Sequence, residues 1–270
     1  MILKKEHKCF CGSNKNINQC HKGVRSNSKY AKVYKLYSKI EKDILDKIKE
    51  LNLKPKCGKG CSECCHQIFS ISEVEFCIII DYLLEHYTKK QIDEIFEKSY
   101  EIINYLKIND PIFFKRLQSD VTGGNLTELI YSNLPWKENV IPQGCVFLND
   151  KNECIIYKIR PLICRTHGVA YFSKDYNNQL CSKLKISDEN RNEFVDLTSY
   201  NDEASSSYFF KYKDNIITRR PYPIFYWFCF LKDNGLNLNK FKKTVLYSRY
   251  VVLSESEMIE ELFKVVENIF

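Results

Sequence analysis

The chain has 270 residues, of which 44% are hydrophobic, enough to bury the core of one large domain or of one domain plus a small module. Its net charge of +7 comes from 41 basic and 34 acidic residues spread along the chain. This pattern is typical of solvated helix faces and gives no strong nucleic-acid signal. The longest apolar runs fall well short of the roughly 20 residues that cross a bilayer, so we expect no membrane span.

The thirteen cysteines are the most informative part of the composition. The first residues contain no apolar signal-peptide core, so we expect a cytoplasmic protein. In that compartment clustered thiols are metal ligands or redox groups more often than disulfides. The sequence contains no phosphate loop, dinucleotide fingerprint, HExxH helix or serine nucleophile elbow, which argues against a hydrolase, a kinase or an ordinary dehydrogenase.

The first cysteine group lies in the segment CFCGSNKNINQCHKG, where Cys9 and Cys11 flank one residue and Cys20-His21 follow. Three thiolates and one imidazole are a complete tetrahedral donor set for zinc. The pattern resembles the SEC-C zinc motif, known from the C-terminus of the SecA translocation ATPase, although Phe10 stands where that motif usually has proline. The resemblance implies a zinc-binding module over residues 1–26 that contacts a protein partner.

Helical periodicity and capping patterns predict most of the remaining regular structure. Apolar residues at steps of three and four predict an amphipathic helix over residues 28–51, within a linking region at 27–54. The pairs Ser72/Glu75 and Thr88/Gln91 are capping boxes that predict two further helices. Additional helices are predicted from Asp110-Pro111 onward, near 126–133, and within 241–270, so the expected fold is mainly α.

The second and third cysteine groups are the candidate ligands of a central metal centre. Short apolar runs on both sides of the turn Asn149-Asp150 predict a small β-hairpin at the third group. A single tetrahedral ion cannot use so many thiols, which favours two metals or a polynuclear cluster, and thiolates alone do not distinguish zinc from iron–sulfur chemistry. The candidate ligands are Cys57, Cys61, Cys64, Cys65, Cys145, Cys154, Cys164 and Cys181.

The segments CGKGCSECC and CVFLNDKNECIIYKIRPLICRTHG, followed by Cys181, resemble the YkgJ-type cysteine-cluster family, which is described as a zinc- or iron-chelating domain. The resemblance spans about residues 55–185. It implies that all eight cysteines bind metal within a mostly helical, metal-stabilised domain. The family includes flagellin lysine N-methylases, which extends the expectation to protein-modifying chemistry.

Two functions follow from these patterns. One is an enzyme with an iron or iron–sulfur centre that modifies a protein or peptide, with S-adenosylmethionine as a candidate cosubstrate and His167 as a candidate general base or extra ligand. The other is a non-enzymatic adaptor, stabilised by zinc, that contacts the ribosome or a protein-export partner. Arg160 and Arg165, beside Cys164, are expected to offset thiolate charge in either case.

The region after residue 186 carries no metal motif and is expected to pack on the metal domain as an aromatic-rich and helical extension. Its aromatic run is either core or a substrate groove that would be lined by Tyr222, Tyr226 and Trp227. Cys77 and Cys229 lie in apolar surroundings and are expected to be small core residues.

Overall fold

The structure is a computed structural model that describes residues 8–55, 60–118, 141–172, 189, 191–200, 203–204, 211–212, 215–216 and 221–233. Two of the candidate ligands, Cys57 and Cys181, lie outside these residues, as do the helices predicted near 126–133 and within 241–270.

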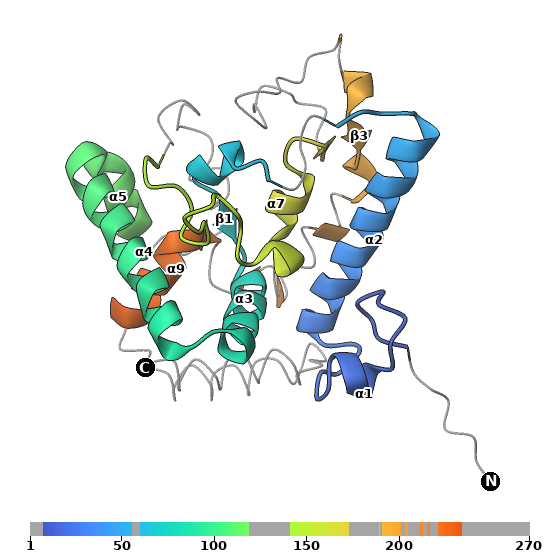
Figure 1. Ribbon diagram of the computed structural model, residues 1–270, viewed down its shortest axis with the longest axis horizontal. Helices are drawn as coiled ribbons and strands as arrows, with labels where there is room; N and C mark the ends of the chain where they lie inside the picture. The colour runs from blue at the N-terminus through green and yellow to red at the C-terminus, as the bar shows by residue number, and fades with distance from the viewer. Residues whose placement is uncertain are drawn as a thin grey trace.

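The described chain is mainly helical, as the sequence predicts (Figure 1). In Figure 1, α2 lies on one side of the molecule and α4, α5 and α9 on the other, with α3 and α7 between them. The α-helices are α1 (Ile17–Cys20), α2 (Lys29–Glu50), α3 (Glu73–His86), α4 (Lys89–Asn109), α5 (Pro111–Gln118), α7 (Leu162–Thr166) and α9 (Ile224–Asp233). Short 3-10 turns are η1 (Glu63–His66), η3 (Tyr157–Ile159), η4 (Arg191–Glu193) and η5 (Thr198–Tyr200).

The long helices begin where their capping residues predict. Ser28 caps α2, with its side chain accepting from the backbone of the third helical residue. The two predicted capping boxes are both formed, at Ser72 for α3 and at Thr88 for α4. Asp110 Oδ1 accepts from Phe113 N at 3.0 Å at the start of α5. Each cap satisfies backbone N–H groups that the first helical turn leaves without a partner.

In the part of the chain that the structure describes, the strands form three two-stranded sheets. β1 (Ser70–Ile71) pairs antiparallel with β6 (Tyr222–Pro223), with Ile71 opposite Tyr222. β2 (Ala170–Tyr171) pairs in parallel with β3 (Val195–Asp196), and β4 (Lys211–Tyr212) pairs antiparallel with β5 (Asn215–Ile216).

The hairpin predicted at the third cysteine group is smaller than two full strands. It consists of one antiparallel bridge between Leu148 and Cys154, and Ile155 N donates to Phe147 O at 2.9 Å. The side chain of Asn149 accepts from the backbone of Lys151 and Glu153, so it satisfies N–H groups within the turn. Local side-chain hydrogen bonds of this kind compete with a longer ladder.

The core is built around α3 and the aromatic residues of α9. Phe76 stacks on Trp227 with ring centroids 5.2 Å apart, and Phe228 meets Phe76 edge to face at 5.0 Å. Trp227 is 1% exposed and donates from Nε1 to Ile71 O at 3.0 Å. The aromatic run therefore packs as core at Trp227, and the expected burial of Cys77 and Cys229 is confirmed. No helix in the described part of the chain combines the length and apolar character that crossing a membrane requires.

Candidate metal centres

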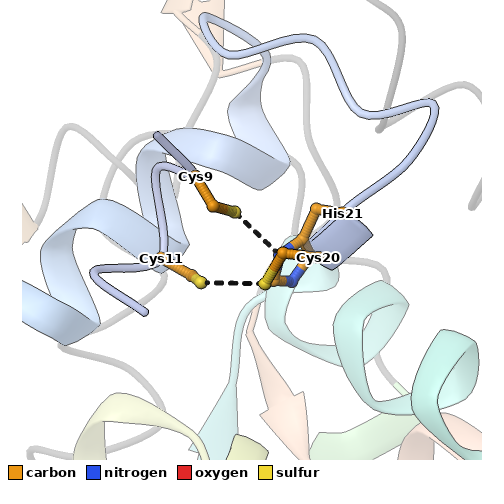
Figure 2. Close-up of side chains that lie close together, drawn as sticks. All are labelled: Cys9, Cys11, Cys20 and His21. Atoms are coloured by element: carbon orange, nitrogen blue, oxygen red, sulfur yellow. Dashed lines mark hydrogen bonds between the residues drawn. The ribbon is translucent and has the colours of Figure 1, made fainter. Parts of the chain in front are cut away.

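The N-terminal group of three cysteines and one histidine comes together in space (Figure 2). The candidate ligand atoms of Cys9, Cys11, Cys20 and His21 all lie within 4.8 Å of one another. Cys9 Sγ is 3.2 Å from His21 Nδ1, and Cys11 Sγ is 3.4 Å from Cys20 Sγ. A zinc tetrahedron with ordinary Zn–S and Zn–N bonds has ligand–ligand edges of roughly 3.4–3.8 Å. The four side chains therefore fit one tetrahedral zinc ion.

The hydroxyl of Ser13 lies beside these thiols. The cysteine spacing alone did not identify Ser13 as part of the site. Ser13 Oγ lies 3.2 Å from both Cys11 Sγ and Cys20 Sγ. Burial raises the pKa of Cys9 to about 12. Burial also acts to raise the pKa of Cys11, but hydrogen bonds from Ser13 and the neighbouring thiols outweigh it and lower that pKa. Hydrogen bonds to ligand sulfurs favour the thiolate form that metals bind.

The N-terminal site is packed directly onto α2. Tyr34 meets the His21 ring edge to face at 4.7 Å, and Phe10 contacts the same ring at 4.9 Å. Ser38 Oγ donates to Cys11 O. Gly12 has a φ of +76°, and a Cβ there would lie 2.9 Å from Ser38 Oγ, so the turn needs glycine for both conformation and space.

The six described cysteines of the central groups line one cavity of about 120 Å³. Its other walls are largely apolar, with aromatic side chains at Phe69, Phe147 and Phe225. The sulfurs come from the segment before η1, from η1 itself, from the residues around the small hairpin and from α7. They are Cys61, Cys64, Cys65, Cys145, Cys154 and Cys164.

The central thiols are less tightly grouped than those of the N-terminal site. Within the described residues, only the N-terminal group has three or more candidate ligand atoms within 4.8 Å of one another. A 3-10 turn, η1, carries Cys64 and Cys65. Cys65 N donates to Ser62 O at 2.9 Å in that turn. The 3-10 geometry gives three residues per turn and so separates adjacent side chains differently from an α-helix.

The surroundings of the central sulfurs favour neutral thiols in the absence of a cation. Burial raises the pKa of Cys145 to about 12 and raises the pKa values of Cys154 and Cys164. A hydrogen bond with Cys65, together with burial, raises the pKa of Cys64. A bound metal ion reverses this balance, because coordination deprotonates a thiol and releases its proton. The donor set therefore suits a metal ion that several of these cysteines bind as thiolates.

The helix that carries Cys164 is held by two carboxylates that the metal motifs did not point to. Glu75 Oε1 accepts from Leu162 N and from Tyr37 OH, both at 2.8 Å. Arg165, whose side chain is 4% exposed, forms an ion pair with Glu41 of α2 and stacks over the Tyr37 ring at 4.4 Å. The expectation that Arg165 offsets thiolate charge needs revision, because its nearest charged partner is this carboxylate. The capping-box pattern in the sequence indicated that Glu75 caps a helix. Its contacts with Leu162 and Tyr37 are seen only in the fold.

Two further polar side chains line the cavity close to the thiols. Burial lowers the pKa of His167 to about 4, so its imidazole is neutral at pH 7, the form that binds metals. His167 is 3% exposed and meets Phe69 at 4.8 Å. Arg160 lies over the Tyr157 ring at 4.0 Å, and its charge opposes the burial that raises the pKa of Cys154. Of the two arginines, Arg160 is therefore the one whose charge partly offsets the effect of burial on the pKa of a cavity thiol.

These features define a mainly helical protein with two thiol-rich sites suited to metal binding. Residues 56–184 match the model of the CxxCxxCC family, whose description is "Putative zinc- or iron-chelating domain". The match agrees with the family resemblance seen in the cysteine spacing, and it covers all eight central cysteines. No curated protein and no solved structure shows significant similarity to the chain. The family and the N-terminal cluster together support metal binding.

Proposed function

We propose that the protein holds two different metal centres. The N-terminal centre is a structural zinc ion bound by Cys9, Cys11, Cys20 and His21, whose spacing fits one tetrahedral ion. Its donors leave no coordination position open, which is typical of zinc that stabilises a fold. The module boundaries at residues 1–26 and 27–54 are part of this proposal.

The central centre is proposed to be a polynuclear, thiolate-ligated centre that contains iron. The observation that carries it is that six cysteines from separate segments line one cavity. One tetrahedral ion takes four ligands, so six or more sulfurs suit two metals or an iron–sulfur cluster. Cys57 and Cys181 are proposed as the remaining two ligands, within a domain over residues 55–185.

The reaction proposed for this centre is the modification of a protein or peptide. The mostly apolar walls around the sulfurs, with a few polar side chains among them, are typical of a ligand-binding site. When bound, the iron would supply redox or Lewis-acid chemistry. His167 is proposed as an additional ligand or proton acceptor in this site, with S-adenosylmethionine as the candidate cosubstrate. The buried neutral imidazole supports the ligand role more than the base role, because a pKa of about 4 makes a weak base at pH 7.

The test is elemental analysis with acid-labile sulfide determination and an absorption spectrum, on protein purified without oxygen. We expect about one zinc, several irons, acid-labile sulfide and a brown chromophore, with S-adenosylmethionine binding tested next. Two to three zincs without colour would contradict the iron centre. That result would favour the adaptor, for which the partial exposure of Cys11, Cys20 and His21 offers a contact surface.

A further inference from the structure

In the wall of the central cavity, the side chains of Gln67 and Arg160 each carry a polar atom that has no hydrogen-bond partner among the described residues. These atoms are Gln67 Oε1, an acceptor, and Arg160 Nε, a donor, and solvent reaches neither atom. Buried polar groups nearly always have a partner, because removing one from water without replacement costs about 1–3 kcal/mol. A donor and an acceptor in the wall of one cavity indicate that the occupant of that cavity supplies both partners.

Arg160 and Gln67 are each held beside the sulfurs by other contacts. The guanidinium of Arg160 lies over the Tyr157 ring, and its Nη2 is 3.9 Å from Glu41 on α2. Gln67 follows η1 directly, and its backbone N donates to Cys64 O at 3.0 Å. Both residues therefore stay beside the sulfurs while Nε and Oε1 remain available to a bound group.

A centre made only of metal and cysteines would satisfy Arg160 but not Gln67. Thiolate sulfur accepts hydrogen bonds, so it can pair with Arg160 Nε. Cysteines that bind metal have lost their protons, however, and cannot donate to Gln67 Oε1. The cysteines therefore cannot be the partner of Gln67, which leaves the ring N–H of His167 in the same wall or an O–H or N–H group of a bound ligand.

We infer that the central metal centre is an open one, in which an exchangeable protic ligand donates a hydrogen bond to Gln67 and accepts one from Arg160. In the resting protein this ligand is water. A hydroxyl- or amine-bearing group of a small substrate or of a substrate side chain replaces it. The inference rests on the proposed central metal centre and deepens it, because it assigns that centre a coordination position for substrate, whereas a structural centre is closed.

The experiment uses the full chain loaded with cobalt(II), whose visible bands report the ligands of the metal. Two probes separate the two side chains: azide accepts hydrogen bonds only, and metal-bound imidazole donates through its distal N–H. We expect saturable spectral changes with both. Arg160→Met should weaken azide binding by about 10–100-fold and spare imidazole, whereas Gln67→Met should weaken imidazole binding by a similar factor and spare azide.

Matched controls come from exposed residues of the same types. Arg25→Met and Gln143→Met should leave both probes unaffected, because both side chains are exposed and neither lines the cavity. Arg160→Lys should not restore azide binding, because lysine keeps the charge but has no Nε–H at that place in the side chain.

Different experimental results would contradict the inference and the proposed metal centre. If cobalt content equals that of a Cys164→Ser variant, no metal occupies the cavity and the proposed centre itself is wrong. If cobalt fills the cavity but neither probe changes its bands, the centre is closed and the inference is overturned. Equal weakening of both probes by both cavity variants would also overturn it, because that result indicates general disturbance of the site.

Discussion

The two thiol-rich sites differ in how the chain builds them. The N-terminal donors lie within residues 9–21, and their ligand atoms are within 4.8 Å of one another. The central cavity draws its sulfurs from segments near residues 61–65, 145–154 and 164, and these sulfurs are less closely grouped. A site made from one short segment needs only a turn, whereas a site made from distant segments depends on helices that hold the segments together.

The two sites also differ in whether they leave room for a ligand besides the metal. Four donors at tetrahedral spacing leave room for one ion, and the surrounding contacts with α2 hold the ring of His21. The central cavity has more sulfurs than one ion can use and also has polar atoms that sulfur cannot satisfy. The first arrangement is suited to stabilising a module and the second to binding a further ligand.

The strongest test of this difference is Cys164→Ser. We expect loss of the central metal and unfolding of the central domain, because serine is a poor ligand for soft metals and metal-binding free energy reaches roughly 10 kcal/mol in zinc peptides. Metal content and a thermal melting curve measure the effect. Cys77→Ala is the control: Cys77 is a buried cysteine that does not line the cavity, so the variant should keep its metal. Full metal content in Cys164→Ser would contradict the eight-cysteine centre.

Cys20→Ser should have a smaller, local effect. We expect loss of about one zinc with the central metal retained, because the N-terminal donors are complete without any residue from the cavity. Metal analysis of the variant beside the unmodified protein measures this. Loss of both metals would show that the two sites do not form independently.

The ion pair between the buried Arg165 and the partly exposed Glu41 tests the attachment of α7 to α2. Glu41→Gln leaves the charge of Arg165 without its partner, and we expect a loss of about 1–3 kcal/mol in the free energy of unfolding. The comparison is Glu203→Gln, which breaks the exposed Lys39–Glu203 pair and should cost about 0–1 kcal/mol. Urea denaturation of both variants gives the two values, and equal values would contradict the special role of the Arg165 pair.

The smallest effect is expected for Tyr37→Phe. It removes the 2.8 Å hydrogen bond to the buried carboxylate of Glu75 and should cost about 1–2 kcal/mol of unfolding free energy. Tyr30→Phe removes a 2.7 Å bond to the partly exposed Asp81, where water can replace the hydroxyl, and should cost less. Denaturation midpoints of the two variants test the order, and a larger loss for Tyr30→Phe would reverse the argument.

Local sequence signals predicted the helices well because those signals act locally. Capping boxes and apolar steps of three and four identified the starts of α3 and α4 and the extent of α2. The spacing of Cys9, Cys11 and Cys20-His21 likewise indicated a group that the structure brings together.

The misses have two causes, which are contacts between distant segments and local hydrogen bonds within a turn. Nothing near Arg165 in the sequence indicates that its charge pairs with Glu41, far away on α2. The single-bridge hairpin differs from expectation because hydrogen bonds within its turn outweigh regular strand pairing. The unpartnered Oε1 of Gln67 becomes visible only when the cavity wall is complete.

The carboxylate of Glu75 restricts which residues can occupy that position as the protein evolves. Its oxygens accept from Tyr37 OH, Leu162 N, Ser72 N and Ser72 Oγ, which uses all of the roughly four lone-pair sites of an ionised carboxylate. A capping box alone accepts either acid or amide, and in this chain Gln91 performs the same capping task for α4. At position 75, however, the NH₂ of a glutamine would face donors. We therefore expect sequences that share this fold to vary freely between Glu and Gln at position 91 and to retain Glu at position 75.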